Sequence, residues 1–167
     1  MVFFLYVNSK DDRNRISMTE HTPTTLLEIH ESSLPGFNPL VDSVHWRVAL
    51  LNFDPALTPQ HLSEFQRHNE SEEVFVLLSG RCILFLGEGE NSVRHIFAQD
   101  LEPFKLYCVQ RRIWHTHVLS IDAKLLIVEN QNTSRDNSPC TNVTRDQHAE
   151  ILDRIHLFWG DERGGQE

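Results

Sequence analysis

The chain has 167 residues, of which 40% are apolar and 23% are charged, a composition typical of one folded domain rather than of a disordered protein. Its formal net charge is −9, so the chain repels phosphate backbones, which argues against general nucleic-acid binding. Its apolar stretches are far shorter than the roughly 20 residues that a membrane-spanning helix needs, so no membrane span is predicted.

The N-terminal region differs from the rest of the chain. The run Val2–Val7 is apolar, but it has no basic leading segment and is short for a secretory signal. We interpret residues 1–17 as an N-terminal extension or as a strand exchanged between subunits. Met18 is an alternative start of the protein.

Short strand-like runs dominate the middle of the chain. The predicted strands are Val44–Phe53, Glu73–Leu78, Arg81–Leu86, Val93–Ala98, Phe104–Val109, Thr116–Leu119 and Lys124–Glu129. Turn residues separate these runs at intervals of about ten positions, and no helices alternate with them. The pattern predicts an all-β, antiparallel sandwich or barrel, and it disfavours a parallel sheet.

Two glycine-containing turns are predicted to form hairpins within this sheet structure. Ser79-Gly80 stands between two apolar runs and indicates a tight hairpin, and residues 87–91 indicate a looser and exposed one. Residues 129–139 form a polar, irregular stretch.

The end of the chain has the pattern of a helix. Thr144 and Gln147 have the spacing of a capping box, and apolar residues then recur at helical spacing as far as Gly160. We therefore assign residues 18–143 to a β-barrel, residues 144–160 to a C-terminal helix of the same domain, and residues 161–167 to a tail.

The cysteines give no sign of a disulfide framework or a zinc ribbon. Cys82, Cys108 and Cys140 are an odd number, are widely spaced and form no CxxC pair. The first two lie in apolar strand-like runs, where a buried and unreactive thiol is expected. The pattern indicates a reducing, cytoplasmic setting.

Two stretches carry the residues that suggest chemistry. His68 is followed after four residues by Glu73, and Glu73 is followed after six residues by Gly80. The second stretch contains His115 and His117, which point to one face if residues 113–119 form a strand, because side chains alternate along a strand.

These stretches resemble the paired motifs of the cupin superfamily. The first cupin motif is His-x-His, three or four residues, Glu, six residues and Gly, and this chain matches it from the second His onward. Of the second motif, Pro-x-Gly-x-x-His-x-x-x-Asn, only the His is present, as His115, with Gln110, Arg112 and Leu119 at the other positions. The resemblance covers residues 44–130 and implies a cupin-type jelly-roll β-barrel with a C-terminal helix.

The resemblance also implies one divalent metal ion inside the barrel. Carried over by position, its ligands are His68, Glu73 and His115, with Gln66 where the family has its first His. Two imidazoles and one carboxylate suffice for iron, manganese, nickel or zinc, and a Gln oxygen is a weaker ligand that can complete the shell. His117 would contribute from one layer away.

Two charged residues near these motifs have simpler interpretations. Glu72 neighbours Glu73, so it should point the other way, into solvent. Arg47 lies in an apolar strand; an outward Arg on a solvated face is the simpler case, and an inward one would meet an anionic group of a substrate.

The predicted function is that of a metal-dependent enzyme acting on a small polar metabolite as an isomerase, lyase or dioxygenase, with Glu73 and His115 as catalytic residues. One alternative is a non-catalytic cupin that binds a small molecule or a sugar. Another is a metal-free sugar isomerase or epimerase in which His and Glu act as acid and base. Because cupins are commonly dimers, the resemblance also implies a homodimer.

Overall fold

The computed structural model describes residues 23–160. These residues form ten strands, one short 3-10 helix and one α-helix. The elements are β1 (Gly36–Asp42), β2 (Trp46–Asn52), η1 (Pro55–Leu57), β3 (Glu64–Gln66), β4 (Glu73–Ser79), β5 (Cys82–Glu88), β6 (His95–Asp100), β7 (Leu106–Val109), β8 (Trp114–Leu119), β9 (Lys124–Asn130), β10 (Cys140–Asn142) and α1 (Arg145–Trp159).

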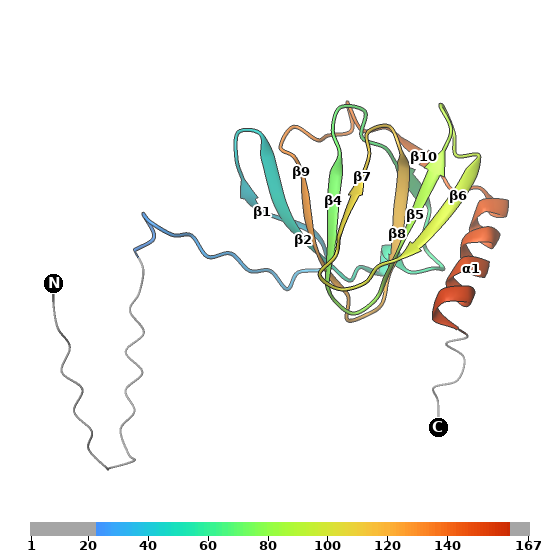
Figure 1. The fold of residues 1–167 in the computed structure, drawn as a ribbon, viewed down its shortest axis with the longest axis horizontal. Coiled ribbons are helices and arrows are strands. Elements are labelled where there is room, and N and C mark those ends of the chain that lie inside the picture. The colour runs from blue at the N-terminus through green and yellow to red at the C-terminus, as the bar shows by residue number, and fades with distance from the viewer. Residues whose placement is uncertain (1–22, 161–167) are drawn as a thin grey trace, which may run out of the picture.

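The strands form two antiparallel sheets of five strands each. The first sheet has the order β1-β2-β9-β4-β7 and the second has the order β10-β3-β8-β5-β6. Figure 1 shows the two sheets curving around a common interior, with α1 lying outside next to β6. This is the antiparallel jelly-roll barrel with a C-terminal helix that the sequence predicts.

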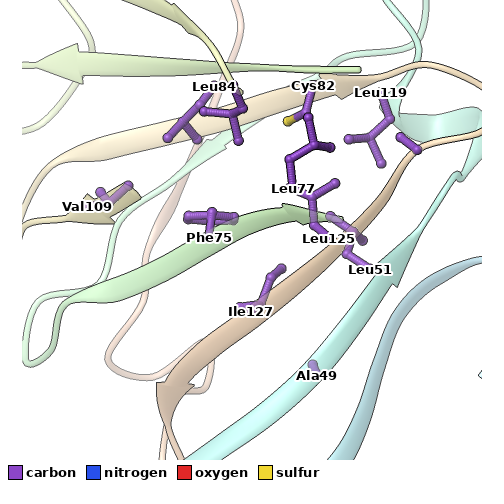
Figure 2. Close-up of a cluster of buried hydrophobic side chains, with 12 residues drawn as sticks. Ala49, Leu51, Phe75, Leu77, Cys82, Leu84, Val109, Leu119, Leu125 and Ile127 are labelled. Carbon is purple, nitrogen blue, oxygen red and sulfur yellow. The ribbon is translucent and has the colours of Figure 1, made fainter. Parts of the chain in front are cut away.

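The interior between the sheets is packed with apolar side chains in regular rows (Figure 2). Cross-strand partners on β2, β9 and β4 lie side by side and face inward. One row is Leu51, Leu125 and Leu77, and the next is Ala49, Ile127 and Phe75. All six are at most 3% exposed, so these rows supply much of the apolar burial that stabilises the barrel.

Helix α1 covers the outer face of the second sheet. The predicted capping box is confirmed, because the Thr144 hydroxyl accepts from the Gln147 N–H and the Gln147 side chain accepts from the Thr144 N–H. The helix ends at Gly160, also as predicted. Ile151 and Ile155 are buried in a second apolar cluster between the helix and the sheet.

The hairpin predicted at Ser79-Gly80 is wrong. The strands on either side of it, β4 and β5, belong to different sheets, so the turn carries the chain from one wall of the barrel to the other. Gly80 has a φ of 70°, and a Cβ there would lie 2.5 Å from the Cα of Ala123, so the turn packs against the backbone. The looser hairpin at residues 87–91 is confirmed, since β5 and β6 pair with each other.

Three strands were not predicted from the sequence. β1 contains Pro39, which disfavours a strand assignment except at a sheet edge, and β1 is an edge strand with an irregular register after Pro39. β3 and β10 have three residues each, too few for an alternating pattern to show. β10 also ends the polar stretch of residues 129–139.

The burial predicted for one of the cysteines is wrong. Cys82 is buried as expected, but Cys108 is exposed, because Tyr107 and Val109 are the residues of the edge strand β7 that face inward.

Some sequence predictions lie outside the described residues. They concern Val2–Val7, the extension of residues 1–17 and the tail of residues 161–167, and the homodimer stays a prediction. Within residues 23–160, no helix is long and apolar enough to cross a membrane.

Candidate metal centre

Two residues beyond the row of Ala49, Ile127 and Phe75, the inner face of the first sheet carries charged side chains, and we call this level the upper row. Arg47 and Glu129 are cross-strand partners on β2 and β9, and Glu73 is the first residue of β4. They line a cavity of about 490 Å³, to which the second sheet contributes Gln66 and His115. The cavity therefore lies where the apolar rows give way to charged side chains, and Leu51, Phe75 and Ile127 of those rows also line it.

His68 lies in the loop between β3 and β4, and backbone hydrogen bonds hold the loop on both sides of it. The N–H of Arg112 donates to the His68 carbonyl at 2.8 Å. Arg67 N–H and Asn69 N–H donate to carbonyls of the 131–139 loop, at Pro139 and Asn137. His68 is 5% exposed, so this irregular segment is fixed in place and directs the His68 side chain into the barrel.

Three predicted ligands come together in this cavity. The Nε2 atoms of His68 and His115 lie 3.0 Å and 2.9 Å from the same atom, Glu73 Oε2. One ligand atom from each of the three residues lies within 4.8 Å of the others, and all three side chains are buried. The contact between His115 and Glu73 is short, but it does not have hydrogen-bonding geometry.

Hydrogen bonds at the opposite ring nitrogens fix the tautomers of both histidines. His115 Nδ1 lies 3.1 Å from the Ile113 carbonyl, which only accepts, so Nδ1 carries the proton. His68 Nδ1 lies 2.7 Å from Ser138 Oγ. Because the Ser138 hydroxyl donates to Asn137 Oδ1 at 3.0 Å, it accepts from His68, and His68 Nδ1 also carries its proton.

The orientation of Asn137 supports this assignment. Its Nδ2 donates to the Glu70 carboxylate and to the Asn132 carbonyl, while its Oδ1 accepts from the N–H of Ser134. The amide oxygen therefore faces Ser138. In their neutral forms, both imidazoles consequently point the lone pair of Nε2 at a carboxylate oxygen.

The charges of the site depend on these contacts. Burial alone would raise the pKa of Glu73, but the two imidazoles outweigh it and hold the pKa at about 2. Burial alone would lower the pKa of His68, but the Glu73 carboxylate raises it above the usual value. The carboxylate is therefore ionised and requires positive charge beside it.

The remaining predicted residues occupy different positions. Gln66 is the register partner of His115 and lines the same cavity. His117 shares the inward face of β8 with His115, as predicted, and its ring centroid lies 5.9 Å from that of Phe75. Neither ring nitrogen of His117 has a hydrogen-bond partner, and burial lowers its pKa to about 4. His117 therefore lies one layer below the three converging residues.

The prediction that Arg47 points outward into solvent is wrong. Its side chain is 19% exposed, and it donates to Asp42 Oδ1 at 2.7 Å and to Glu129 Oε1 at 3.3 Å. Arg47 is at an inward position because it lies two and four residues before Ala49 and Leu51, which face the core. Glu72 is exposed as predicted and forms an ion pair with Arg111 at 2.9 Å.

Two residues of the site were missed in the sequence. Glu129 is 7% exposed and lines the cavity, and it lies at the inward positions of β9 with Leu125 and Ile127. The alternation of inward positions along β9 could therefore have identified Glu129 from the sequence. Ser138, the partner of His68, lies in a loop whose sequence has no comparable pattern.

No family model and no curated protein matches the chain. Among solved structures, it is similar to a cupin-2 domain protein from Shewanella frigidimarina, with 16% identity over 64% of this chain and 87% of the other, and a TM-score of 0.40. It is also similar to an RmlC-like cupin from Methanocaldococcus jannaschii, with 11% identity over 62% of this chain and 86% of the other, and a TM-score of 0.42. A third similar structure is a variant of Streptomyces PAC13 with uridine, with 13% identity over 75% of this chain and 93% of the other, and a TM-score of 0.48. These similarities concern the fold alone.

Proposed function

We propose that the chain holds one divalent metal ion through His68, Glu73 and His115, with Gln66 beside the site, and that it is a metal-dependent enzyme acting on a small polar metabolite. One observation supports the proposal most strongly. The Nε2 atoms of two imidazoles, each oriented by a hydrogen bond at its Nδ1, lie 3.0 Å and 2.9 Å from one buried carboxylate oxygen.

Three electron-donating atoms in such an arrangement repel one another unless a positive charge lies among them. A proton between Glu73 and one imidazole satisfies that nitrogen alone and leaves the other lone pair facing the carboxylate. A divalent cation satisfies all three atoms together. The hydrogen bonds that the Nδ1 atoms donate to the Ser138 hydroxyl and the Ile113 carbonyl also orient both rings, as outer partners of metal-bound histidines do.

The donor set favours some metals over others. Two imidazole nitrogens and one carboxylate oxygen suit iron, manganese, nickel or zinc better than calcium or magnesium, which prefer oxygen ligands. When bound, such an ion supplies a Lewis acid or lowers the pKa of a bound water. The protein contributes the cavity of about 490 Å³, the fixed rings and an apolar floor that excludes water. These features fit isomerase, lyase or dioxygenase chemistry.

The first test is the metal content of the purified protein, with chelation and reconstitution. Wild type should hold one ion per chain and lose thermal stability on chelation. Glu73→Gln and His115→Ala should bind the ion more than about 100-fold more weakly, because each removes a ligand and the remaining two cannot enclose it. Glu72→Gln is the matched control and should bind as wild type does. Equal metal content in all four proteins would place the site elsewhere.

A metal-free enzyme is the second candidate, and the raised pKa of His68 favours it. A protonated His68 beside an ionised Glu73 is an acid and a base in contact, which is the pair that a proton-transferring isomerase uses. Wild type that takes up no metal even after reconstitution, and whose stability does not respond to a chelator, would support this candidate over the metal enzyme.

A further inference from the structure

The cavity contains a second buried carboxylate that the three converging residues do not use. Glu129 is 7% exposed and lines the same cavity as Glu73. Among the described residues, it does not belong to the group whose ligand atoms lie within 4.8 Å of one another. Glu129 therefore borders the space that a substrate would occupy rather than the position of the ion.

Among residues 23–160, the only cation bonded to Glu129 is shared with another acid. Arg47 donates from Nη1 to Glu129 at 3.3 Å and from Nε to Asp42 at the shorter distance of 2.7 Å. One guanidinium charge thus faces two carboxylates, and Glu129 is compensated only in part. Burial and the charge of Glu73 raise the pKa of Glu129 against the opposing effects of His68 and Arg47, which agrees with this incomplete compensation.

The whole cavity has no surplus of positive charge for an anion. Among its described lining residues, the carboxylates are Asp54, Glu64, Glu73 and Glu129, and the cations are Arg47 and Arg135. Arg135 is exposed, and Arg47 is already engaged by Asp42 and Glu129. A divalent ion at the three converging residues would bring the sum of these charges only to zero.

We propose that Glu129, held in place by Arg47, excludes anions from the cavity and makes an uncharged polar small molecule the substrate, rather than an organic acid or a phosphate. This inference deepens the function proposed above and rests on it. An ionised carboxylate only accepts hydrogen bonds, so it binds the hydroxyl or N–H groups of a neutral ligand. The ionised oxygens of an organic acid or a phosphate offer Glu129 no donor and meet repulsion that is strong away from water.

Oxalate is a suitable probe, and its affinity can be measured by calorimetry at pH 7.5 for wild type and Glu129→Gln. The substitution keeps the shape of the side chain and removes its charge, so oxalate should bind at least about tenfold more tightly to the variant. Glu64→Gln neutralises an exposed carboxylate of the same cavity and should change the affinity less than about twofold. Equal oxalate affinity in wild type and Glu129→Gln would overturn the proposal.

The metal content of wild type and variant separates this proposal from the previous one. If neither protein holds metal, the proposed metal enzyme fails, while the oxalate comparison still decides the role of Glu129, because its charge acts with or without the ion. If only Glu129→Gln loses the metal, Glu129 is itself a ligand and the anion-excluding role is overturned. Glu129→Met, which is also uncharged, replaces the Gln variant if circular dichroism shows that the latter does not fold.

Discussion

The inner face of the first sheet has two regions built on the same three strands. In the lower region, β2, β9 and β4 present Leu51, Leu125 and Leu77 in one row and Ala49, Ile127 and Phe75 in the next. In the upper region, the same alternation presents Arg47 and Glu129, with Glu73 at the start of β4. One backbone pattern therefore forms a packed core at one level and a charged site at the next.

The difference shows where the stability and the chemistry of the barrel are located. The lower rows remove apolar surface from water, which stabilises the fold. The upper row buries two carboxylates, which costs free energy unless cations or donors compensate them. The apolar burial in the lower rows must therefore offset the free energy that burying these carboxylates costs. Substitutions in the two regions should consequently have separate effects.

The largest expected effect concerns the lower region. Leu125 is fully buried, and Leu125→Ala should lower the free energy of unfolding by about 2–5 kcal/mol, because it leaves a cavity between the sheets. Chemical denaturation measures the change. The folded variant should still bind metal as wild type does, since the upper row is untouched. Loss of metal affinity together with stability would mean that the two regions are not separable.

The second prediction concerns His117, which lies at the boundary between the regions. Its pKa is about 4 in the folded protein and about 6.5 when unfolded, so the unfolded state binds more protons between these pH values. The free energy of unfolding should therefore fall as pH falls from 6.5 to 4, by about 3 kcal/mol from this group.

The comparison with His117→Leu isolates this contribution, because the raised pKa of His68 acts in the opposite direction in both proteins. Urea unfolding of the chelator-treated proteins across this pH range should show wild type losing more stability than the variant. Parallel curves would show that His117 takes up its proton equally well in the folded state, and that it belongs to the polar region above it.

The third prediction concerns the support of the upper region from outside the barrel. Ser138→Ala removes the acceptor of the His68 Nδ1 proton, so the metal affinity should fall about 10–100-fold. Ser138→Thr keeps a hydroxyl and should restore most of it. Competition with a chromophoric chelator measures both. If Ser138→Ala binds metal as tightly as wild type, His68 is oriented by the backbone of its loop alone.

The smallest expected effect concerns the turn that carries Arg112. This residue has a φ of 65°, the left-handed conformation that glycine adopts without strain, and its N–H holds the His68 carbonyl. Arg112→Gly should stabilise the protein by about 0.5 kcal/mol, because the relief of strain exceeds the greater freedom of glycine in the unfolded chain. Thermal unfolding measures it, and a destabilised variant would show that the Arg112 side chain matters more than its backbone.

The sequence predicted those parts of the molecule that depend on periodicity and on spacing. Strand-like runs bounded by turn residues located seven of the strands, the capping box located α1, and the motif spacing identified His68, Glu73 and His115, which the structure brings together. Arg112 stands where the second motif has Gly, and it has the left-handed conformation that glycine adopts without strain.

The sequence failed where long-range contacts decide the structure. The turn at Gly80 has the composition of a hairpin, and only its packing against Ala123 shows that it crosses between sheets. Ser138 is remote from His68 in the sequence and lies in an irregular loop. Glu129 was missed because a charged residue at the end of an apolar run is ordinarily solvated. It lies two residues after Ile127, however, and so on the same inward face of the strand.

Anomalous diffraction from crystals soaked in zinc, recorded at the zinc absorption edge, locates a bound ion directly. We expect one strong peak per chain, bounded by His68 Nε2, His115 Nε2 and Glu73 Oε2, and no such peak in Glu73→Gln crystals treated in the same way. A wild-type barrel without a peak among these atoms, or a peak that persists unchanged in the variant, would show that these three residues do not hold the metal.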